Sequence, residues 1–195
     1  KQRTEMLTGD RPETATGDTL HLSLFNSMSV RFGERDVGIK GLKARAALAY
    51  IALSEGRQET RERLVGLLWS ESGEDKARAS LRQTLRDLRR ACDGVGYRGL
   101  HTEWRGIGLA PGGVEADVWA VVEQAEQHQA HPLLLNVPGL VDSLLAGFDD
   151  LDPAFRVWLL AKRRTLQDRL LRALETGMRN AELDPSRRNR LAEAI

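Results

Sequence analysis

The sequence predicts an α+β protein that is mainly α-helical, with its short strands confined to the first part of the chain. Two observations indicate this. Brief runs of alternating apolar and polar residues occur near the start, and the remainder carries longer segments with apolar residues at helical spacing. The length of 195 residues allows two small domains, each with its own core. The 41% apolar and 29% charged residues are typical of a soluble globular protein.

Short strands are expected after a polar leader. Residues 1–18 are polar and show no periodicity, so we expect a flexible leader there. Strand-like alternation follows at 20–25 and again at 28–32. A turn at 33–36 then precedes a short apolar segment at 37–39. Together these segments predict a small antiparallel meander.

Three helices and a hairpin are expected next. The helices span 43–54, 61–69 and 75–91, and residues 100–110 have the pattern of a hairpin. Strands, three helices and a terminal hairpin in this order predict a winged helix-turn-helix, which we place at residues 19–112. In that fold the last helix enters the major groove of DNA, and the hairpin lies near the adjacent backbone.

The predicted third helix has two distinct faces. Steps of about 100° per residue place one apolar stripe on the core side: Ala77, Leu81, Leu85, Leu88 and Cys92. The residues expected to contact base edges lie on the opposite side: Lys76, Ala79, Arg82, Gln83, Arg86 and Arg90. None of these six is acidic, and Arg82, Arg86 and Arg90 repel one another at i, i+4, i+8 spacing, which a polyanionic partner would relieve.

The chemistry of this face suits DNA. Gln83 can bond an adenine edge, and the small Ala79 lets the helix axis approach closely. For the helix considered alone, a solvated basic face in a helical bundle explains the pattern equally well. The surrounding winged helix-turn-helix pattern favours DNA.

Residues on neighbouring elements are expected to contact the DNA backbone. Thr60 is placed to cap the helix at 61–69, which leaves amides of the first turn available to a phosphate. Arg105 at the hairpin tip suits a phosphate or minor-groove contact, although an ordinary solvent-exposed turn arginine would fit the same position. The residues assigned to the DNA backbone are Lys43, Arg45, Thr60, Arg61, Arg63 and Arg105.

The second part of the chain, residues 113–195, predicts an all-helical, tetratricopeptide-like domain that is truncated. Helices are expected at 117–127, 140–145 and 153–180, and a further one from Asp184. The helix at 153–180 has a continuous apolar stripe that includes Phe155, Trp158 and Leu159. We expect this stripe to pack on the helices at 117–127 and 140–145.

No enzyme chemistry is indicated. His128 and His131 lack a third metal ligand, and Cys92 falls on the apolar stripe, so we expect no metal and no cofactor. Asp149 and Asp150 precede a helix that needs acids for capping. The net charge of +1 means that DNA affinity must come from local clustering. A single cysteine and the lack of a long apolar run fit a cytoplasmic protein with no membrane contact.

Several segments resemble the streptomycete antibiotic regulatory protein (SARP) family. Residues 42–53 resemble its first helix, 61–69 (RERLVGLLW) its second, and 77–91 (ARASLRQTLRDLRRA) its third. Residues 143–148, followed by 152–171, resemble the start of its bacterial transcriptional activator domain. The resemblance implies a winged-helix domain joined to a helical domain, binding to promoter repeats, and recruitment of RNA polymerase.

We therefore expect a sequence-specific DNA-binding transcriptional regulator, and an activator in particular. Its expected partners are double-stranded DNA, RNA polymerase and a second copy of the chain on DNA repeats. Two alternatives remain open from the sequence. The helical domain could be the working surface of a protein-interaction module, or the chain could be the output module of a larger signalling protein.

Overall fold

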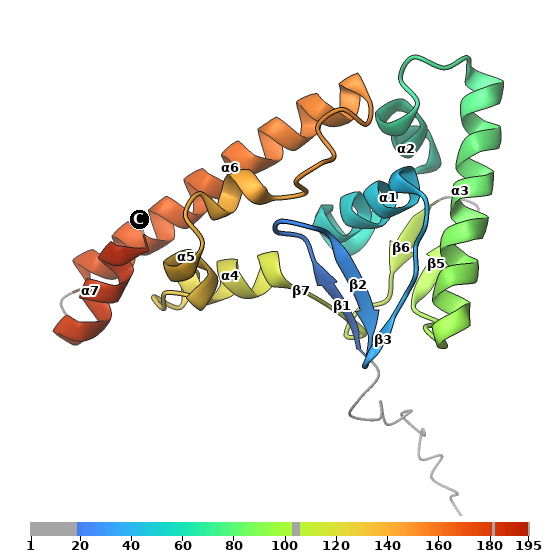
Figure 1. The fold of residues 1–195 in the computed structure, drawn as a ribbon. Helices are drawn as coiled ribbons and strands as arrows, with labels where there is room; N and C mark the ends of the chain where they lie inside the picture. Colours follow the sequence, from blue (N-terminus) through green and yellow to red (C-terminus); the bar gives the residue numbers. More distant parts are fainter. Residues whose placement is uncertain (1–18, 103–105, 181, 195) are drawn as a thin grey trace, which may run out of the picture.

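The computed structural model describes residues 19–102, 106–180 and 182–194, and it has the α+β, mainly helical fold that the sequence predicts. The expected leader at 1–18 and Arg105 at the hairpin tip lie outside the described residues. In Figure 1 the strands and the first three helices form one end of the molecule, and the last two helices extend toward the opposite end.

The first sheet combines the N-terminal strands with a strand from far along the chain. Its strand order is β3–β2–β1–β7, and its strands are β1 (Leu20–Ser23), β2 (Ser29–Phe32), β3 (Arg35–Asp36) and β7 (Val114–Ala116). The β1–β2 and β2–β3 pairs are antiparallel, as predicted for the meander, whereas β7 runs parallel to β1. The position of the third strand was predicted wrongly, because β3 lies at 35–36, within the predicted turn, and residues 37–39 form no strand. Alternate residues of β1 and β2 are buried, which confirms the predicted alternation.

The winged-helix elements follow in the predicted order. They are α1 (Leu42–Leu53), the short 3₁₀ turn η1 (Glu55–Arg57), β4 (Gln58–Glu59), α2 (Arg61–Leu68), α3 (Glu74–Val95), β5 (Leu100–Thr102) and β6 (Ile107–Leu109). The hairpin strands β5 and β6 pair with β4 in a second sheet, in the order β4–β6–β5. The side chain of Thr60 caps α2 by accepting a hydrogen bond from the backbone N–H of Arg63 at 3.2 Å, as predicted.

The remaining elements are helical. They are α4 (Asp117–Glu126), α5 (Pro132–Asn136), the 3₁₀ turn η2 (Leu140–Ser143), α6 (Pro153–Arg179) and α7 (Pro185–Glu193). The expected packing of α6 on α4 and on η2 is present. The predicted helix at 140–145 is only this 3₁₀ turn, because Leu145 has a positive φ and its backbone N–H bonds to the carbonyl of Leu24 at 2.8 Å.

One apolar core runs through both parts of the chain, from Leu20 in β1 to Leu191 in α7. Asp117, the first residue of α4, accepts hydrogen bonds from the backbone N–H groups of Leu24 (2.9 and 3.0 Å) and Phe25 (3.2 Å). Burial raises the pKa of this carboxyl group, and these donors oppose the shift. The sequence analysis placed a domain boundary between residues 112 and 113. The strand that follows this boundary, β7, belongs to the N-terminal sheet.

A buried carboxylate joins the start of α6 to the turn that precedes α3. Asp152 is only 7% exposed and caps α6 by accepting from the backbone N–H of Ala154 at 3.0 Å. It also accepts from the backbone N–H of Ser70 at 3.0 Å and from its hydroxyl at 2.6 Å. Trp158, one turn further along α6, lies edge-on to Tyr50 of α1. The start of α6 thus buttresses the helix-turn-helix.

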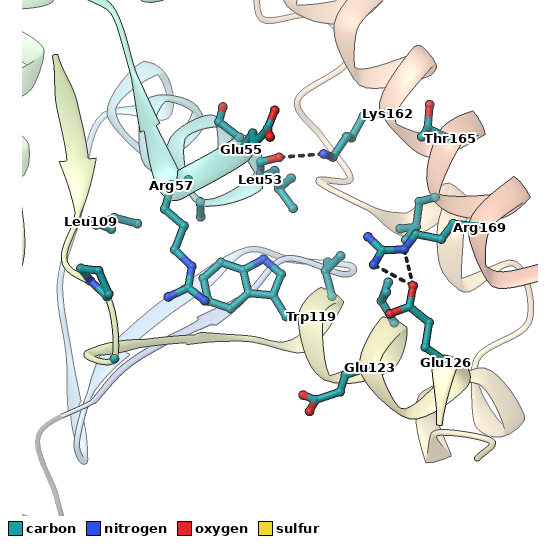
Figure 2. A pocket seen from close by; sticks show the side chains of 18 residues that line it. Leu53, Glu55, Arg57, Leu109, Trp119, Glu123, Glu126, Lys162, Thr165 and Arg169 are labelled. Carbon is teal, nitrogen blue, oxygen red and sulfur yellow. Dashed lines mark hydrogen bonds and ion pairs between the residues drawn. The ribbon is translucent and has the colours of Figure 1, made fainter. Parts of the chain in front are cut away.

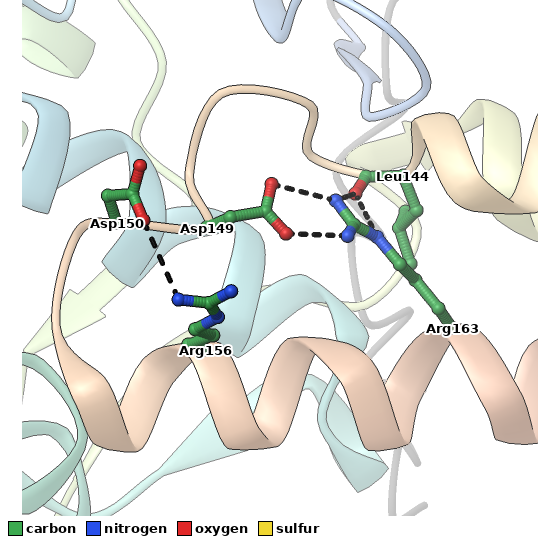
Figure 3. A network of polar contacts seen from close by, with 5 residues as sticks. All are labelled: Leu144, Asp149, Asp150, Arg156 and Arg163. Carbon is green, nitrogen blue, oxygen red and sulfur yellow. Dashed lines mark hydrogen bonds and ion pairs between the residues drawn. The ribbon is translucent and has the colours of Figure 1, made fainter.

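A second junction lies further along α6 (Figure 3). The Arg163 guanidinium donates to both carboxylate oxygens of Asp149, at 2.6 and 3.2 Å, and to the carbonyl of Leu144, at 2.8 and 3.0 Å. The hydrogen bonds from Arg163 lower the pKa of the Asp149 carboxyl group. Because Leu144 also forms a β-bridge with Phe25, this arginine ties α6 to the loop that leads back to β1.

Candidate nucleic-acid interface

Helix α3 exposes the face that the sequence analysis assigned to DNA. The predicted core stripe is buried in full, together with Val95 at the end of the helix. All six predicted base-contacting residues are exposed to solvent: Lys76, Ala79, Arg82, Gln83, Arg86 and Arg90. In Figure 1, α3 stands at the outer edge of the molecule, with the hairpin and the other two helices of the winged-helix unit to one side.

The arginines on this face have few acidic partners. Among the described residues, no ion pair involves Lys76, Arg82 or Arg86. Arg90 lies 3.8 Å from Asp87, which is a loose pairing between two solvent-exposed side chains. The repulsion predicted for this face therefore remains in the isolated chain.

One acid lies beside the six residues and was not singled out from the sequence. Asp87 accepts hydrogen bonds from the Gln83 amide nitrogen through both carboxylate oxygens, at 2.9 and 3.0 Å. The amide oxygen of Gln83 accepts from Nη1 of Arg86 at 3.0 Å. The signal was present in the sequence, because Gln83 and Asp87 have the i,i+4 spacing at which helical side chains meet.

The start of α2 holds three of the residues assigned to the DNA backbone. Arg63 is exposed and lies 3.9 Å from the largely buried Glu59 carboxylate. Arg61 is half-buried, and the hydroxyl oxygen of Thr60 is engaged in capping the helix. Burial raises the pKa of Tyr50 beneath this segment, and Glu59 adds to the shift.

Lys43 and Arg45 are held within the fold, away from Arg63. The Lys43 ammonium donates to the carbonyl of Leu68 at the end of α2 and lies 4.9 Å from the Trp69 ring centre. Arg45 donates to the carbonyl of Met28 and lies 5.8 Å from the Phe148 ring centre. These contacts give both side chains a structural role that the sequence analysis did not anticipate.

A cleft of about 740 Å³ lies between the winged-helix unit and α4 and α6 (Figure 2). The Arg57 guanidinium lies 4.0 Å from the Trp119 ring centre, and Lys162 donates to the Leu53 carbonyl at 2.7 Å. Arg169 pairs with Glu126 at 2.7 Å. Burial, with a smaller effect of Arg169, lowers the pKa of the Lys162 amine. Arg57, Lys162 and Arg169 are thus each engaged in a contact between the elements that line the cleft.

Other chemistry is sparse in the described part of the chain. No group of three His, Cys, Asp or Glu side chains there could hold a metal ion. Cys92 is buried in the core, and burial raises its pKa to about 11, so its thiol is not a reactive thiolate. None of the described helices combines the length and hydropathy of a membrane span.

The elements and the exposed helix define a winged helix-turn-helix packed against a helical unit. Among solved structures, the fold is similar to that of EmbR from Mycobacterium tuberculosis, determined in complex with a low-affinity phosphopeptide. The TM-score is 0.57 at 18% sequence identity, over 83% of this chain and 45% of the EmbR chain. No protein-family model and no curated protein sequence matches. At this identity the likeness concerns the fold, and the chain spans less than half of EmbR.

Proposed function

We propose that the protein is a sequence-specific DNA-binding transcriptional regulator in which α3 contacts base edges in the major groove. The observation that carries the proposal is the exposed face of α3, where Lys76, Arg82 and Arg86 form no ion pair within the described residues. Ala79, Gln83 and Arg90 complete the surface. Arginine suits guanine O6 and N7, and the Gln83 amide suits adenine N6 and N7.

Contacts to phosphates are proposed for the start of α2 and for the hairpin. Arg63 is exposed, and it lies with Thr60 and Arg61 at the helix end where positive potential is highest. Arg105 at the hairpin tip remains assigned from the sequence. Lys43 and Arg45 are left out of the proposed contacts, because intramolecular bonds hold their side chains.

The similarity to EmbR, a SARP-family regulator, supports a regulatory role, because the sequence resembles the same family. On this basis we propose a cytoplasmic activator that binds promoter repeats as more than one copy and recruits RNA polymerase. The helical unit would fix the orientation of α3 and present a surface to the polymerase.

The test is selection of duplexes by the full 195-residue chain from a library of random sequence, followed by titration of selected and unselected duplexes at several salt concentrations. We expect one enriched motif, bound at least a thousandfold more tightly than unselected DNA, with affinity for both falling steeply as salt rises. If the folded chain enriches no motif and binds no duplex at low salt, α3 is not a DNA-contacting helix.

A second candidate function, a protein-interaction or output module, is favoured by one observation. Val157 and Leu160, one turn apart on α6, are 69% and 52% exposed. Replacement of Val157 and Leu160 by serine should leave any DNA binding of the chain unchanged, whichever of the two functions is correct. Loss of activation in a reconstituted transcription assay would place the partner surface on α6, and loss of a protein partner without any DNA binding would favour the interaction module.

A further inference from the structure

Asp87 lies on the surface that the proposed function turns toward DNA. Its side chain is 49% exposed, and its neighbours on the same face are Gln83, Arg86 and Arg90. A carboxylate at this position opposes the approach of every phosphate backbone, whatever the base sequence. Its charge therefore weakens binding to phosphates in general, and its hydrogen bonds to a neighbouring side chain are what distinguish it.

The carboxylate fixes the orientation of the Gln83 amide. An ionised carboxylate only accepts hydrogen bonds, so the amide nitrogen must face Asp87. The amide oxygen then faces Arg86, whose guanidinium only donates, and the two atoms are 3.0 Å apart. The order Asp87, Gln83, Arg86 thus admits only one orientation of the amide.

The ordered side chains keep the groups that a base needs. The two contacts of the Gln83 nitrogen to the adjacent oxygens of one carboxylate share a single hydrogen, so its second hydrogen remains free, as does one lone pair of the amide oxygen. One donor and one acceptor are therefore left for an adenine edge. Arg86 has five donors, of which one is engaged with Gln83. Gln83 and Arg86 are three residues apart on one face of α3, about 4.5 Å along the helix axis, and their side chains touch, so they would reach base edges that lie close together.

We propose that Asp87 is a positioning residue that sets the sequence selectivity of α3. By holding Gln83 and Arg86 before DNA arrives, it selects sites in which an adenine and a guanine occupy neighbouring base pairs. This inference rests on the proposed function. Only matched DNA binds Gln83 and Arg86 in this geometry, so only matched DNA would otherwise have to order the two side chains on binding. Ordering them in advance removes this entropic cost and so favours matched DNA.

Two substitutions separate the charge from the hydrogen bonds. Asp87→Asn removes the charge but keeps an oxygen that can accept from Gln83, whereas Asp87→Ala removes both. Titration of each variant with selected and unselected duplexes should show tighter binding to unselected DNA for both, by several-fold at low salt, with a salt slope steeper by up to about one unit. The ratio of matched to unselected affinity should fall about tenfold for Asp87→Ala and stay within about twofold for Asp87→Asn.

A double-mutant cycle tests whether Asp87 acts through Gln83. In a Gln83→Ala background, Asp87→Ala should no longer lower the ratio of matched to unselected affinity. Asp168→Asn is a matched control, because Asp168 on α6 is similarly exposed and pairs with Arg164 at 3.3 Å, as Asp87 pairs with Arg90. The control should change neither affinity.

The outcomes are distinct. Equal ratios for wild type and Asp87→Ala, or an undiminished effect of Asp87→Ala in the Gln83→Ala background, would overturn this inference and leave the proposed function in place. If the folded wild type prefers no duplex sequence, the proposed function fails and this inference fails with it.

Discussion

Helices α3 and α6 are both rich in arginine, but the fold treats their arginines differently. Along α6 most basic side chains have an acidic partner: Arg156 with Asp150, Arg163 with Asp149, Arg164 with Asp168, Arg169 with Glu126 and Arg179 with Glu175. Along α3 the pairs lie at Arg78 near the start and, loosely, at Arg90. Arg82 and Arg86, in the middle, have none within the described residues.

The difference shows that arginine content alone does not indicate a nucleic-acid surface. The α6 arginines connect elements, as Arg163 does with the segment 144–149 that precedes α6, or pair along the helix surface. Arg82 and Arg86 of α3 instead lie on one exposed face with no ion-pair partner within the described residues, and their mutual repulsion is a cost unless a polyanion binds there. The contrast is thus between arginines that stabilise the fold and arginines whose charge the fold leaves without an acidic partner among the described residues.

The largest expected effect comes from removing α6 together with everything else that follows residue 110. A chain ending at Ala110 loses β7, which pairs with β1, and the Asp117 carboxylate that binds two backbone N–H groups. It also uncovers Tyr50, which packs on Trp158. We expect no cooperative thermal transition by circular dichroism. A sigmoidal transition near that of the full chain would show that the winged-helix unit folds alone.

The next effect concerns the α3 arginines. Arg82→Ala and Arg86→Ala should each weaken binding to the selected duplex by about 1–3 kcal/mol and relax preference at one base position. Arg179→Ala, an equally exposed arginine paired on α6, should change neither quantity. If fluorescence anisotropy gives wild-type affinity for both α3 variants, the exposed arginines of α3 do not contact DNA and do not differ in function from those of α6.

A buried α6 arginine should show the opposite behaviour. Arg163→Met leaves the Asp149 carboxylate and the Leu144 carbonyl without their donor, and hydrogen bonds to charged groups are worth about 1.5–3 kcal/mol. We expect the free energy of unfolding in urea to fall by about 2 kcal/mol, with the matched-to-unselected affinity ratio unchanged. An altered ratio in the folded variant would show that this junction also shapes the DNA-contacting surface.

A smaller effect is expected at the start of α2. Arg63→Ala should weaken binding to selected and unselected duplexes alike and lower the salt slope by about one unit, because a phosphate contact carries no base preference. Titrations at four or more salt concentrations give the slope. A loss confined to the selected duplex would place Arg63 among the base-contacting residues.

The smallest effect is on the pH dependence of stability. Arg163 lowers the pKa of Asp149 in the folded chain, so the pair stabilises the fold at pH values above the ordinary Asp pKa. That contribution is lost as the pH falls through the lowered value. Urea unfolding from pH 7 down to about pH 3 should therefore show a shallower decline for Asp149→Asn than for wild type. Parallel declines in the free energy of unfolding would show that solvent screens the Arg163–Asp149 pair and that the pair does not stabilise the fold measurably.

The sequence predicted the α3 face well because its signal lies within one helix. A stripe of apolar residues at helical spacing determines which side is buried, and the opposite side follows from geometry. The cap at Thr60 is equally local. Asp87 was missed because the six residues were considered for their charge and not for their i,i+4 partners.

The sequence could not place Lys43 and Arg45, because α1 has no polar face to serve as a guide. Nine of its twelve residues are buried, and the alanines of α1 lie on several sides of the helix. Which of its two cations reaches solvent depends on the elements that pack around it. The strand β7 is only three residues long, and its pairing with β1 depends on contacts between distant parts of the chain that periodicity does not report.

The pairing of β1 with β7 also bears on how the protein is made. Leu24 and Asp117 are 93 residues apart in sequence, yet one hydrogen-bonds the other. During synthesis on the ribosome the β1–β2 hairpin must wait, with one edge unpaired, until β7 has emerged. Contacts of such long sequence separation slow folding, and an unpaired strand edge invites aggregation in the interval. The nascent chain is therefore most vulnerable between the emergence of β2 and that of β7.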